Sequence, residues 1–395
     1  MGEFEAVAAG LAVHDLTAVQ RDGSVSVDDV SLRVAPGELL VVVGPSGSGK
    51  TTLLRAIAGL AELRCGRVEI GDRDVTGVEP YRRNIAMVFE AGALVPFLDV
   101  AGNLGFGLKN RHVPKEEVAD RVSAEARHLR LSRLLPRKPA TLSAGERGRV
   151  GIGKALIRVP ALWLLDEPLA HLDAAQRFEL RHWLGREVKR LGVTTVLVTH
   201  DPTEALALGD RIAVLDRGQL LQVDTPQGLY QRPGSVFVAD FASTAGVGVV
   251  TARLVSSGGM AGYQVGERTL PCWSPVPPEL EGHVGAEVAL LLRPEDVHDA
   301  ATLDDPDLAR LPGTVLRTEF TGRDLAVTIE LDAPPATCPG VDESGLAGGR
   351  ARVRARFHRS STARPGSPVT LAVDAGRAHV FDPTTGTALW HPTEQ

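Results

Sequence analysis

The chain has 395 residues, which suggests two or three domains with an ample core. Its 43% hydrophobic and 23% charged residues are those of an ordinary soluble globular protein, and its net charge of −6 gives no general attraction to nucleic acid. The three cysteines, Cys65, Cys272 and Cys338, lack the spacing of metal ligands and favour a reducing compartment.

We expect neither a signal peptide nor a membrane span. Residues 1–6 are acidic, whereas a signal peptide begins with positive charge. No apolar run approaches the ~20 residues that cross a bilayer. Any work at a membrane would therefore need a partner.

The first chemical motif follows a predicted strand. Residues 25–34 alternate between apolar and polar side chains and predict strand structure, with a turn at Pro36-Gly37. The apolar run 39–43 predicts a buried strand, and residues 53–58 predict a helix. Between them, residues 44–52 fit G-x-x-x-x-G-K-[ST], the phosphate-binding P-loop, in the strand–loop–helix context that it requires.

Each residue type of this loop suits phosphate. Its glycines let successive backbone N–H groups turn toward phosphate oxygens. We expect Lys50 to reach the β- and γ-phosphates and the Thr51 hydroxyl to ligate Mg²⁺. A glycine-rich turn that matches by chance is the alternative, and the flanking strand and helix argue against it. The expected ATP-binding residues are Gly44, Pro45, Ser46, Gly47, Ser48, Gly49, Lys50, Thr51 and Thr52.

Strands and helices then alternate as far as residue 241. Residues 66–71, 85–89 and 194–199 predict short strands, residues 115–135 have helical spacing, and residues 174–191 predict an amphipathic helix. This alternation favours a parallel α/β core with ligands at the carboxyl ends of its strands.

Acidic residues follow another buried strand at 163–165. Asp166 is placed to hold Mg²⁺ through water, and Glu167 is placed to act as general base toward the attacking water. His200, after the strand at 194–199, is placed to contact the γ-phosphate. Two solvated acids that cap a strand are the alternative.

Residues 142–146, Leu-Ser-Ala-Gly-Glu, resemble the L-S-G-G-Q signature of ABC ATPases, and the resemblance is collinear over residues 11–241. It implies that two such domains face each other head to tail around ATP. Glu90 stands at the Q-loop position, where it would ligate Mg²⁺, and Asp173 lies in the D-loop. The signature residues that would act across the interface are Ser143, Ala144, Gly145 and Glu146.

Segments 94–100 and 103–109 resemble the importer ATPases for maltose, trehalose and glycerol phosphate, together with their polyamine, iron and sulfate relatives. In that family this region receives the permease. Residues 292–297 and 381–386 resemble parts of its carboxy-terminal regulatory barrel.

The predicted secondary structure changes near Phe241, from alternating strands and helices to short strands. Short β-like runs at 247–254, 288–292, 324–331, 350–357 and 368–373 are separated by proline and glycine, and predict a small all-β barrel or pair of barrels. Residues 332–349 predict a long surface loop. The expected domains are an α/β P-loop ATPase domain of ABC type at 1–240, with antiparallel β and helical subdomains, and an OB-like (TOBE) barrel at 241–395.

The chain departs from the family pattern at three places. Glu90 replaces the Q-loop glutamine, and Ala144 and Glu146 replace signature glycine and glutamine. Ala144 would be costly if its backbone needed a positive φ, and each acid adds charge near phosphate. No aromatic residue occupies the adenine-stacking place near residues 19–21, where Arg21 could stack instead.

The resemblance implies the ATP-binding and hydrolysing subunit of a binding-protein-dependent importer for a sugar or related carbohydrate. Polyamine, iron or sulfate import and a slow or non-hydrolysing regulatory subunit remain alternatives, as does a soluble ABC protein of translation or DNA repair. The expected cofactors are ATP and Mg²⁺. The expected partners are a second ATPase subunit forming a homodimer, two transmembrane permease subunits and, indirectly, an extracytoplasmic binding protein, with no nucleic acid. The expected location is the cytoplasmic face of the membrane.

Overall fold

The computed structural model describes residues 8–20, 22–89, 94–158, 160–170, 172–243, 246–303, 305–341 and 349–392, with only the backbone of Trp273. The chain forms two compact units, Met1–Pro226 and Gln227–Gln395. Helix α8 (Val236–Ala242), which spans the expected domain boundary at residue 240, belongs to the second unit. The boundary at residue 240 stays a prediction.

The first unit contains a six-stranded sheet in the order β10-β9-β3-β8-β7-β6. Neighbouring strands from β9 to β6 are parallel, and β10 pairs antiparallel with β9. β3, β7 and β8 are buried along their whole length, as their continuous apolar and β-branched sequences require. The strands are β3 (Leu39–Val43), β6 (Ile85–Val88), β7 (Leu162–Asp166), β8 (Thr194–Thr199), β9 (Arg211–Asp216) and β10 (Gln219–Asp224).

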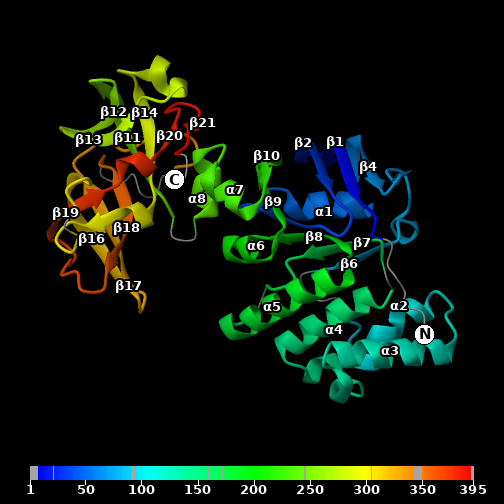
Figure 1. The fold of residues 1–395 in the computed structure, drawn as a ribbon. Coiled ribbons are helices and arrows are strands. Elements are labelled where there is room, and N and C mark those ends of the chain that lie inside the picture. Colours follow the sequence, from blue (N-terminus) through cyan, green and yellow to red (C-terminus); the bar gives the residue numbers. More distant parts are fainter. Residues whose placement is uncertain are drawn as a thin grey trace. The chain divides into compact units, whose positions relative to one another are not determined.

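A second sheet of the first unit is antiparallel and covers helix α1 (Lys50–Ala58). Its order is β2-β1-β4-β5, from β1 (Leu11–Val19), β2 (Val25–Val34), β4 (Glu62–Ile70) and β5 (Arg73–Asp74). Figure 1 shows α1 between this sheet and the parallel one. Leu53, Leu54 and Ile57 of α1 are buried in one core with residues of both sheets, which anchors the loop that precedes the helix.

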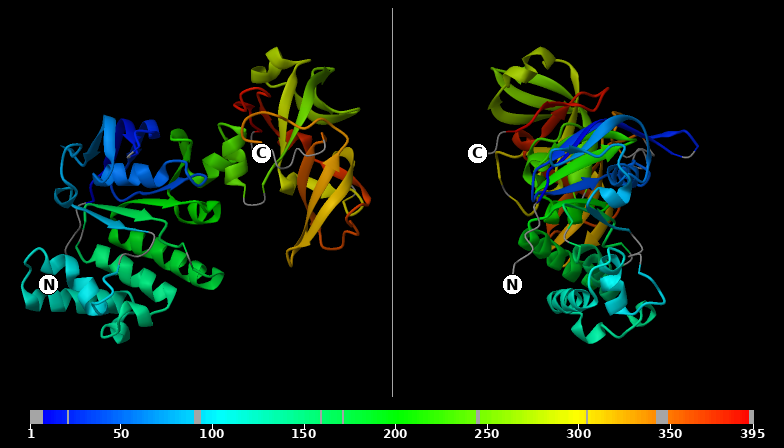
Figure 2. Two further views of the ribbon diagram at one scale, coloured as in Figure 1. Left: turned by 180° about the vertical axis from the view of Figure 1, so that it is seen from behind. Right: turned by 90° about the vertical axis from the view of Figure 1, so that its right-hand side faces the viewer.

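Helices α2 (Val100–Lys109), α3 (Lys115–His128) and α4 (Ala144–Leu156) form a helical subdomain with its own apolar core. Val118, Val122 and Ala126 give α3 its buried face, as their spacing predicted. Figure 2 shows these helices on the side of the parallel sheet away from the antiparallel one. Helices α5 (Ala174–Leu191) and α6 (Pro202–Leu208) complete the unit. No helix in the described part of the chain is both long and apolar enough to cross a bilayer.

The second unit begins with α7 (Pro226–Gln231) and α8 and is otherwise antiparallel β structure. One sheet has the order β13-β12-β11-β14-β20-β21 and the other β15-β19-β16-β17-β18. Residues from both sheets bury one large apolar core, which confirms the predicted barrel-like fold. The strands are β11 (Gly248–Ser257), β12 (Met260–Val265), β13 (Arg268–Pro275), β14 (Glu287–Leu292), β15 (Val297–Asp299), β16 (Ala309–Phe320), β17 (Asp324–Leu331), β18 (Arg352–His358), β19 (Pro368–Val373), β20 (His379–Phe381) and β21 (Ala388–Trp390).

The prediction of a surface loop at 332–349 is wrong for its described first part. Ala333, Ala336 and Cys338 are buried, and the last two join an apolar cluster with residues of α8. The sequence pattern did not predict strand β16, because its buried side chains do not alternate regularly. Its register with β17 shifts between Val315 and Arg317.

The segment that follows β6 is tied to α2 by a buried amide. The Asn103 side chain is fully buried. Its Oδ1 accepts from the Val95 N–H (2.7 Å), and its Nδ2 donates to the carbonyls of Val95 (3.1 Å) and Asp99 (3.0 Å).

We predict that Asn103→Ala lowers the free energy of unfolding of the first unit by about 1–3 kcal/mol, because it leaves buried backbone groups without partners. Urea unfolding followed by tryptophan fluorescence measures the change. Asn110→Ala, at the exposed end of α2, is the matched control. Equal unfolding curves for the two variants would contradict this account.

Candidate nucleotide-binding site

The loop between β3 and α1 depends on glycine at two positions where no side chain fits. At Gly44 a Cβ would lie 1.9 Å from the Leu215 carbonyl oxygen, and at Gly49 it would lie 2.3 Å from that of Ser26. Gly49 also caps α1 with a left-handed backbone (φ 100°) and makes no side-chain cap hydrogen bond. The first N–H groups of α1 are therefore uncapped by any side chain, which is the arrangement that binds anions at helix N-termini.

A cavity of about 510 Å³ opens over this loop. It is lined by loop and helix residues together with side chains from the ends of two other strands. Hydroxyl, ammonium, carboxylate and imidazole groups line it, and no phenylalanine, tyrosine or tryptophan is among the lining residues. The lining residues are Gln20, Ser26, Ser46, Gly47, Gly49, Lys50, Thr51, Thr52, Glu167 and His200.

The register of the parallel strands brings these groups together. Val43, the last residue of β3, pairs with Thr199 of β8, and Val198 pairs with Asp166 of β7. The residues that follow each strand, including Glu167 and His200, therefore emerge at one edge of the sheet beside the loop.

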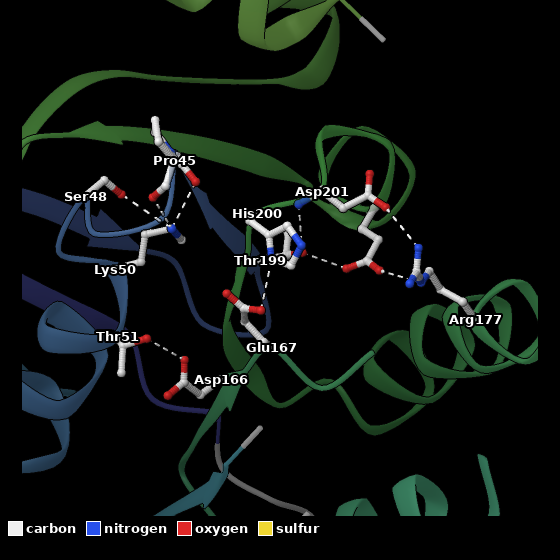
Figure 3. A network of polar contacts seen from close by, with 12 residues as sticks. Pro45, Ser48, Lys50, Thr51, Asp166, Glu167, Arg177, Thr199, His200 and Asp201 are labelled. Atoms are coloured by element: carbon white, nitrogen blue, oxygen red, sulfur yellow. Dashed lines mark hydrogen bonds and ion pairs between the residues drawn. The ribbon is translucent and has the colours of Figure 1, made fainter. Parts of the chain in front are cut away.

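Figure 3 shows the Lys50 ammonium directed toward Pro45 and Ser48 of the loop. Its Nζ donates to the carbonyl oxygens of Gly44 (2.9 Å) and Pro45 (2.7 Å), and lies 3.4 Å from the Ser48 hydroxyl. Burial lowers the pKa of the Lys50 ammonium, whereas the charges of Glu167 and Asp166 raise it. An anion bound in the cavity would favour the charged form further, so the site suits phosphate.

Thr51 and Asp166 are in direct contact. The Thr51 hydroxyl donates to Asp166 Oδ1 over 2.9 Å, although the two residues come from α1 and β7. A hydroxyl and a carboxylate oxygen at hydrogen-bond distance are the hard oxygen ligands that Mg²⁺ takes in proteins. The residues expected to hold Mg²⁺ on these two elements therefore fit that ion.

Glu167 and His200 form a second pair at the cavity. Glu167 Oε2 lies 2.9 Å from His200 Nδ1, and the His200 side chain is largely exposed. The Glu167 N–H donates to the Val198 carbonyl, and its backbone has a left-handed φ of 46°. For a residue with a side chain this conformation costs about 1–3 kcal/mol, and such strain gathers at functional sites.

A polar network behind His200 holds the turn between β8 and α6 (Figure 3). The Thr199 hydroxyl donates to Glu204 Oε2 (2.7 Å) and accepts from the Asp201 N–H (3.1 Å). Arg177 of α5 lies 3.8 Å from Glu204 and 3.9 Å from Asp201. The sequence pattern does not predict this network, because its residues lie on separate elements and meet only when α5 and α6 pack together.

The signature residues lie at the start of α4 and are not among those that line the cavity. Ser143 caps the helix. Its Oγ accepts from the Glu146 N–H, and Glu146 Oε2 accepts from the Ser143 N–H over 2.8 Å. This reciprocal capping box uses glutamate or glutamine equally, which explains how the chain accommodates Glu146. Ala144 is the first residue of α4, so its backbone is right-handed helical and the expected strain is absent in this conformation.

The remaining predicted residues are placed as follows. Asp173 caps α5, where its Oδ1 accepts from the Gln176 N–H over 2.8 Å. Glu90 and Arg21 lie outside the described residues. Gln20 and Ser26 both line the cavity, and the Gln20 side-chain amide donates to the Ser26 hydroxyl over 2.6 Å.

We predict that Glu146→Ala lowers the stability of the helical subdomain by about 1 kcal/mol, whereas Glu146→Gln leaves it unchanged, because only alanine removes the capping box. Hydrogen exchange of the first turn of α4 measures the difference. Equal protection in both variants would mean that the glutamate does not stabilise the helix start.

The chain matches the family model described as ABC transporter over residues 27–170. A trehalose/maltose import ATP-binding protein of Thermococcus litoralis is 39% identical, with 92% of this chain and 95% of that protein covered. A trehalose import ATP-binding protein of Mycobacterium tuberculosis is 38% identical, with 94% and 96% covered. An sn-glycerol-3-phosphate import ATP-binding protein of Chromohalobacter salexigens is 40% identical, with 91% of each chain covered.

Two solved structures each resemble a little over half of the chain. A dimeric ATP-binding cassette in a post-hydrolysis state with ADP and Pi is 28% identical, with a TM-score of 0.50 over 54% of this chain and 98% of that one. The protein cbiO1 of Clostridium perfringens, part of an ABC transporter complex, is 26% identical, with a TM-score of 0.52 over 56% and 90%. The motifs, the fold and relatives matched over nearly their whole length agree: this chain belongs to the ABC transporter family, as an ATP-binding subunit.

Proposed function

We propose that this chain binds and hydrolyses ATP to power an importer for a carbohydrate or a related polyol phosphate. One observation carries the chemistry. Lys50, Thr51 and Glu167 line one cavity over a phosphate-binding loop, and the Thr51 hydroxyl also donates to Asp166 of β7. The trehalose, maltose and glycerol-phosphate import proteins that match nearly the whole chain support the kind of cargo.

The loop binds the triphosphate in this proposal. The N–H groups at the start of α1 point to the β- and γ-phosphates, and Lys50 exchanges its carbonyl partners for phosphate oxygens. This exchange is favourable because an ammonium bonds more strongly to an anion than to a carbonyl in a partly buried site. Gln20 and Ser26 flank the base.

Mg²⁺ fits beside Thr51 and Asp166, which already share a hydrogen bond. Thr51 and Asp166 would hold the ion, and its positive charge would offset the negative charge that develops on the phosphates in the transition state. Glu90 is proposed as a further ligand from the Q-loop position.

Glu167 acts as general base in the proposed reaction. Its carboxylate orients the attacking water and accepts its proton, and His200 holds that carboxylate in place through Nδ1 while contacting the γ-phosphate. The network of Thr199, Glu204 and Arg177 positions His200 by holding its turn.

A second copy of the chain completes the site. Ser143, Ala144, Gly145 and Glu146 of one copy would face the γ-phosphate held by the other, and Asp173 would lie at the interface. The dimeric cassette among the similar structures supports this arrangement. Closure of the pair would drive two permease subunits at the cytoplasmic face of the membrane, while an extracytoplasmic binding protein delivers the cargo.

We predict that Glu167→Gln lowers phosphate release from Mg·ATP by at least 100-fold, because it removes the base and leaves the phosphate site intact. Malachite-green detection of phosphate measures the rate, and equilibrium binding of ATP checks that affinity is retained. Glu179→Gln, an exposed change on α5, is the control and should hydrolyse ATP at the parent rate.

Unchanged turnover in Glu167→Gln would refute the assignment of the base. An ATP-binding chain that releases no phosphate, even with its permease, would instead favour a regulatory subunit, in line with Glu90 at the Q-loop position.

We also predict that Glu167→Gln abolishes cargo uptake by cells or vesicles that carry the complete importer. Uptake of labelled trehalose, maltose and glycerol phosphate identifies the cargo. Continued uptake in this variant would mean that ATP hydrolysis by this chain does not drive transport.

A further inference from the structure

A second cavity, of about 360 Å³, lies beside the start of α4 in the helical subdomain. Its walls come from α4 and from the short segment between α3 and the signature. The lining residues are Arg130, Ser132, Arg133, Leu134, Glu146 and Arg149. Three of these six residues are arginines and one is a glutamate, so the lining carries more positive than negative charge.

The three arginines have no acidic partner in the part of the chain that the structure describes. Arg121 pairs with Glu117 and Arg190 with Glu187 in the same unit, but no ion pair joins Arg130, Arg133 or Arg149 to a described residue. The Nε of Arg149 is buried and lacks a hydrogen-bond partner among the described residues. Three like charges that line one cavity repel one another, so a bound anion would stabilise the arrangement.

Glu146 supplies only part of that counter-charge. The lining has one carboxylate and three guanidinium groups, and the Oε2 of that carboxylate already accepts from the Ser143 N–H. The Ser132 hydroxyl adds a donor, and Leu134 adds an apolar wall. Guanidinium forks match the oxygens of phosphate, and the volume falls in the range of small-molecule sites, larger than a bare phosphate needs.

We propose that this cavity binds a phosphate-bearing metabolite of the size of a sugar phosphate. The phosphate lies among the guanidinium groups of Arg130, Arg133 and Arg149, and the remainder of the ligand covers Leu134. This site is separate from the nucleotide cavity, with which it shares no lining residue.

Ligand binding at this cavity also affects ATP hydrolysis, and this consequence rests on the proposed function. Without a ligand, the three guanidinium groups offset the charge of Glu146 beside the signature. A bound dianion neutralises these groups, so the electrostatic potential at the signature becomes more negative. A more negative potential is less favourable to the γ-phosphate held by the opposite copy. The ligand therefore inhibits ATP hydrolysis.

The binding test uses the full chain with Lys50→Ala, which weakens phosphate binding at the nucleotide loop. Calorimetric titration compares glucose 6-phosphate, inorganic phosphate and glucose. We expect glucose 6-phosphate to bind and glucose not to bind. Arg130→Ala and Arg133→Ala, both at exposed positions, should each weaken binding about tenfold or more, because each removes a charged hydrogen-bond donor. Arg127→Ala, exposed at the end of α3, is the matched control.

Binding that survives the double Arg130→Ala, Arg133→Ala change, or no binding of either phosphate compound, would overturn the site. Equal affinity for inorganic phosphate and glucose 6-phosphate would overturn the sugar-phosphate assignment. For the regulatory step, glucose 6-phosphate should slow phosphate release by the parent chain and not by the double variant. An unaffected parent rate would overturn inhibition alone, and a chain without ATPase activity would still report on the site through calorimetry.

Discussion

The parallel hydrogen bonding of β3, β8 and β7 is the constraint on which the nucleotide site depends. Because Val43 pairs with Thr199 and Val198 with Asp166, three strand ends stop at one edge of the sheet. The phosphate loop, Glu167 and His200 each follow one of these ends. Any slip in this register would separate Glu167 from the loop, so the buried apolar strands position the cavity residues as well as stabilise the sheet.

Packing around this edge of the sheet holds the cavity residues in position. Helix α1 is buried between two sheets, which fixes Lys50 and Thr51 relative to Asp166. Burial raises the pKa of Glu204, and the hydrogen bond from the Thr199 hydroxyl opposes that shift. The network that positions His200 thus keeps a buried carboxyl satisfied while it fixes the turn before α6.

The helical subdomain carries two of the chain's departures from the family pattern, at Ala144 and Glu146. Glu146 is stabilised locally as a capping residue, and Ala144 needs no special backbone conformation at the first position of α4. Three guanidinium groups without described acidic partners lie around the same glutamate. The acid in the signature and three arginines therefore line the same cavity, where a change in the charge of one affects the electrostatic potential at the others.

Local patterns in the sequence determined the nucleotide loop, the acidic pair after β7 and helix α5, because glycine spacing, apolar runs and helical periodicity act over a few neighbouring residues. They also indicated a β-rich second unit, but not β16, whose shifted register hides its alternation, nor the burial of Ala336 and Cys338. Only the tertiary structure decided that Thr51 meets Asp166, that Arg177 reaches Glu204 and that Arg130 and Arg149 share a cavity. These contacts join residues on separate elements, and no short-range pattern specifies how such elements pack.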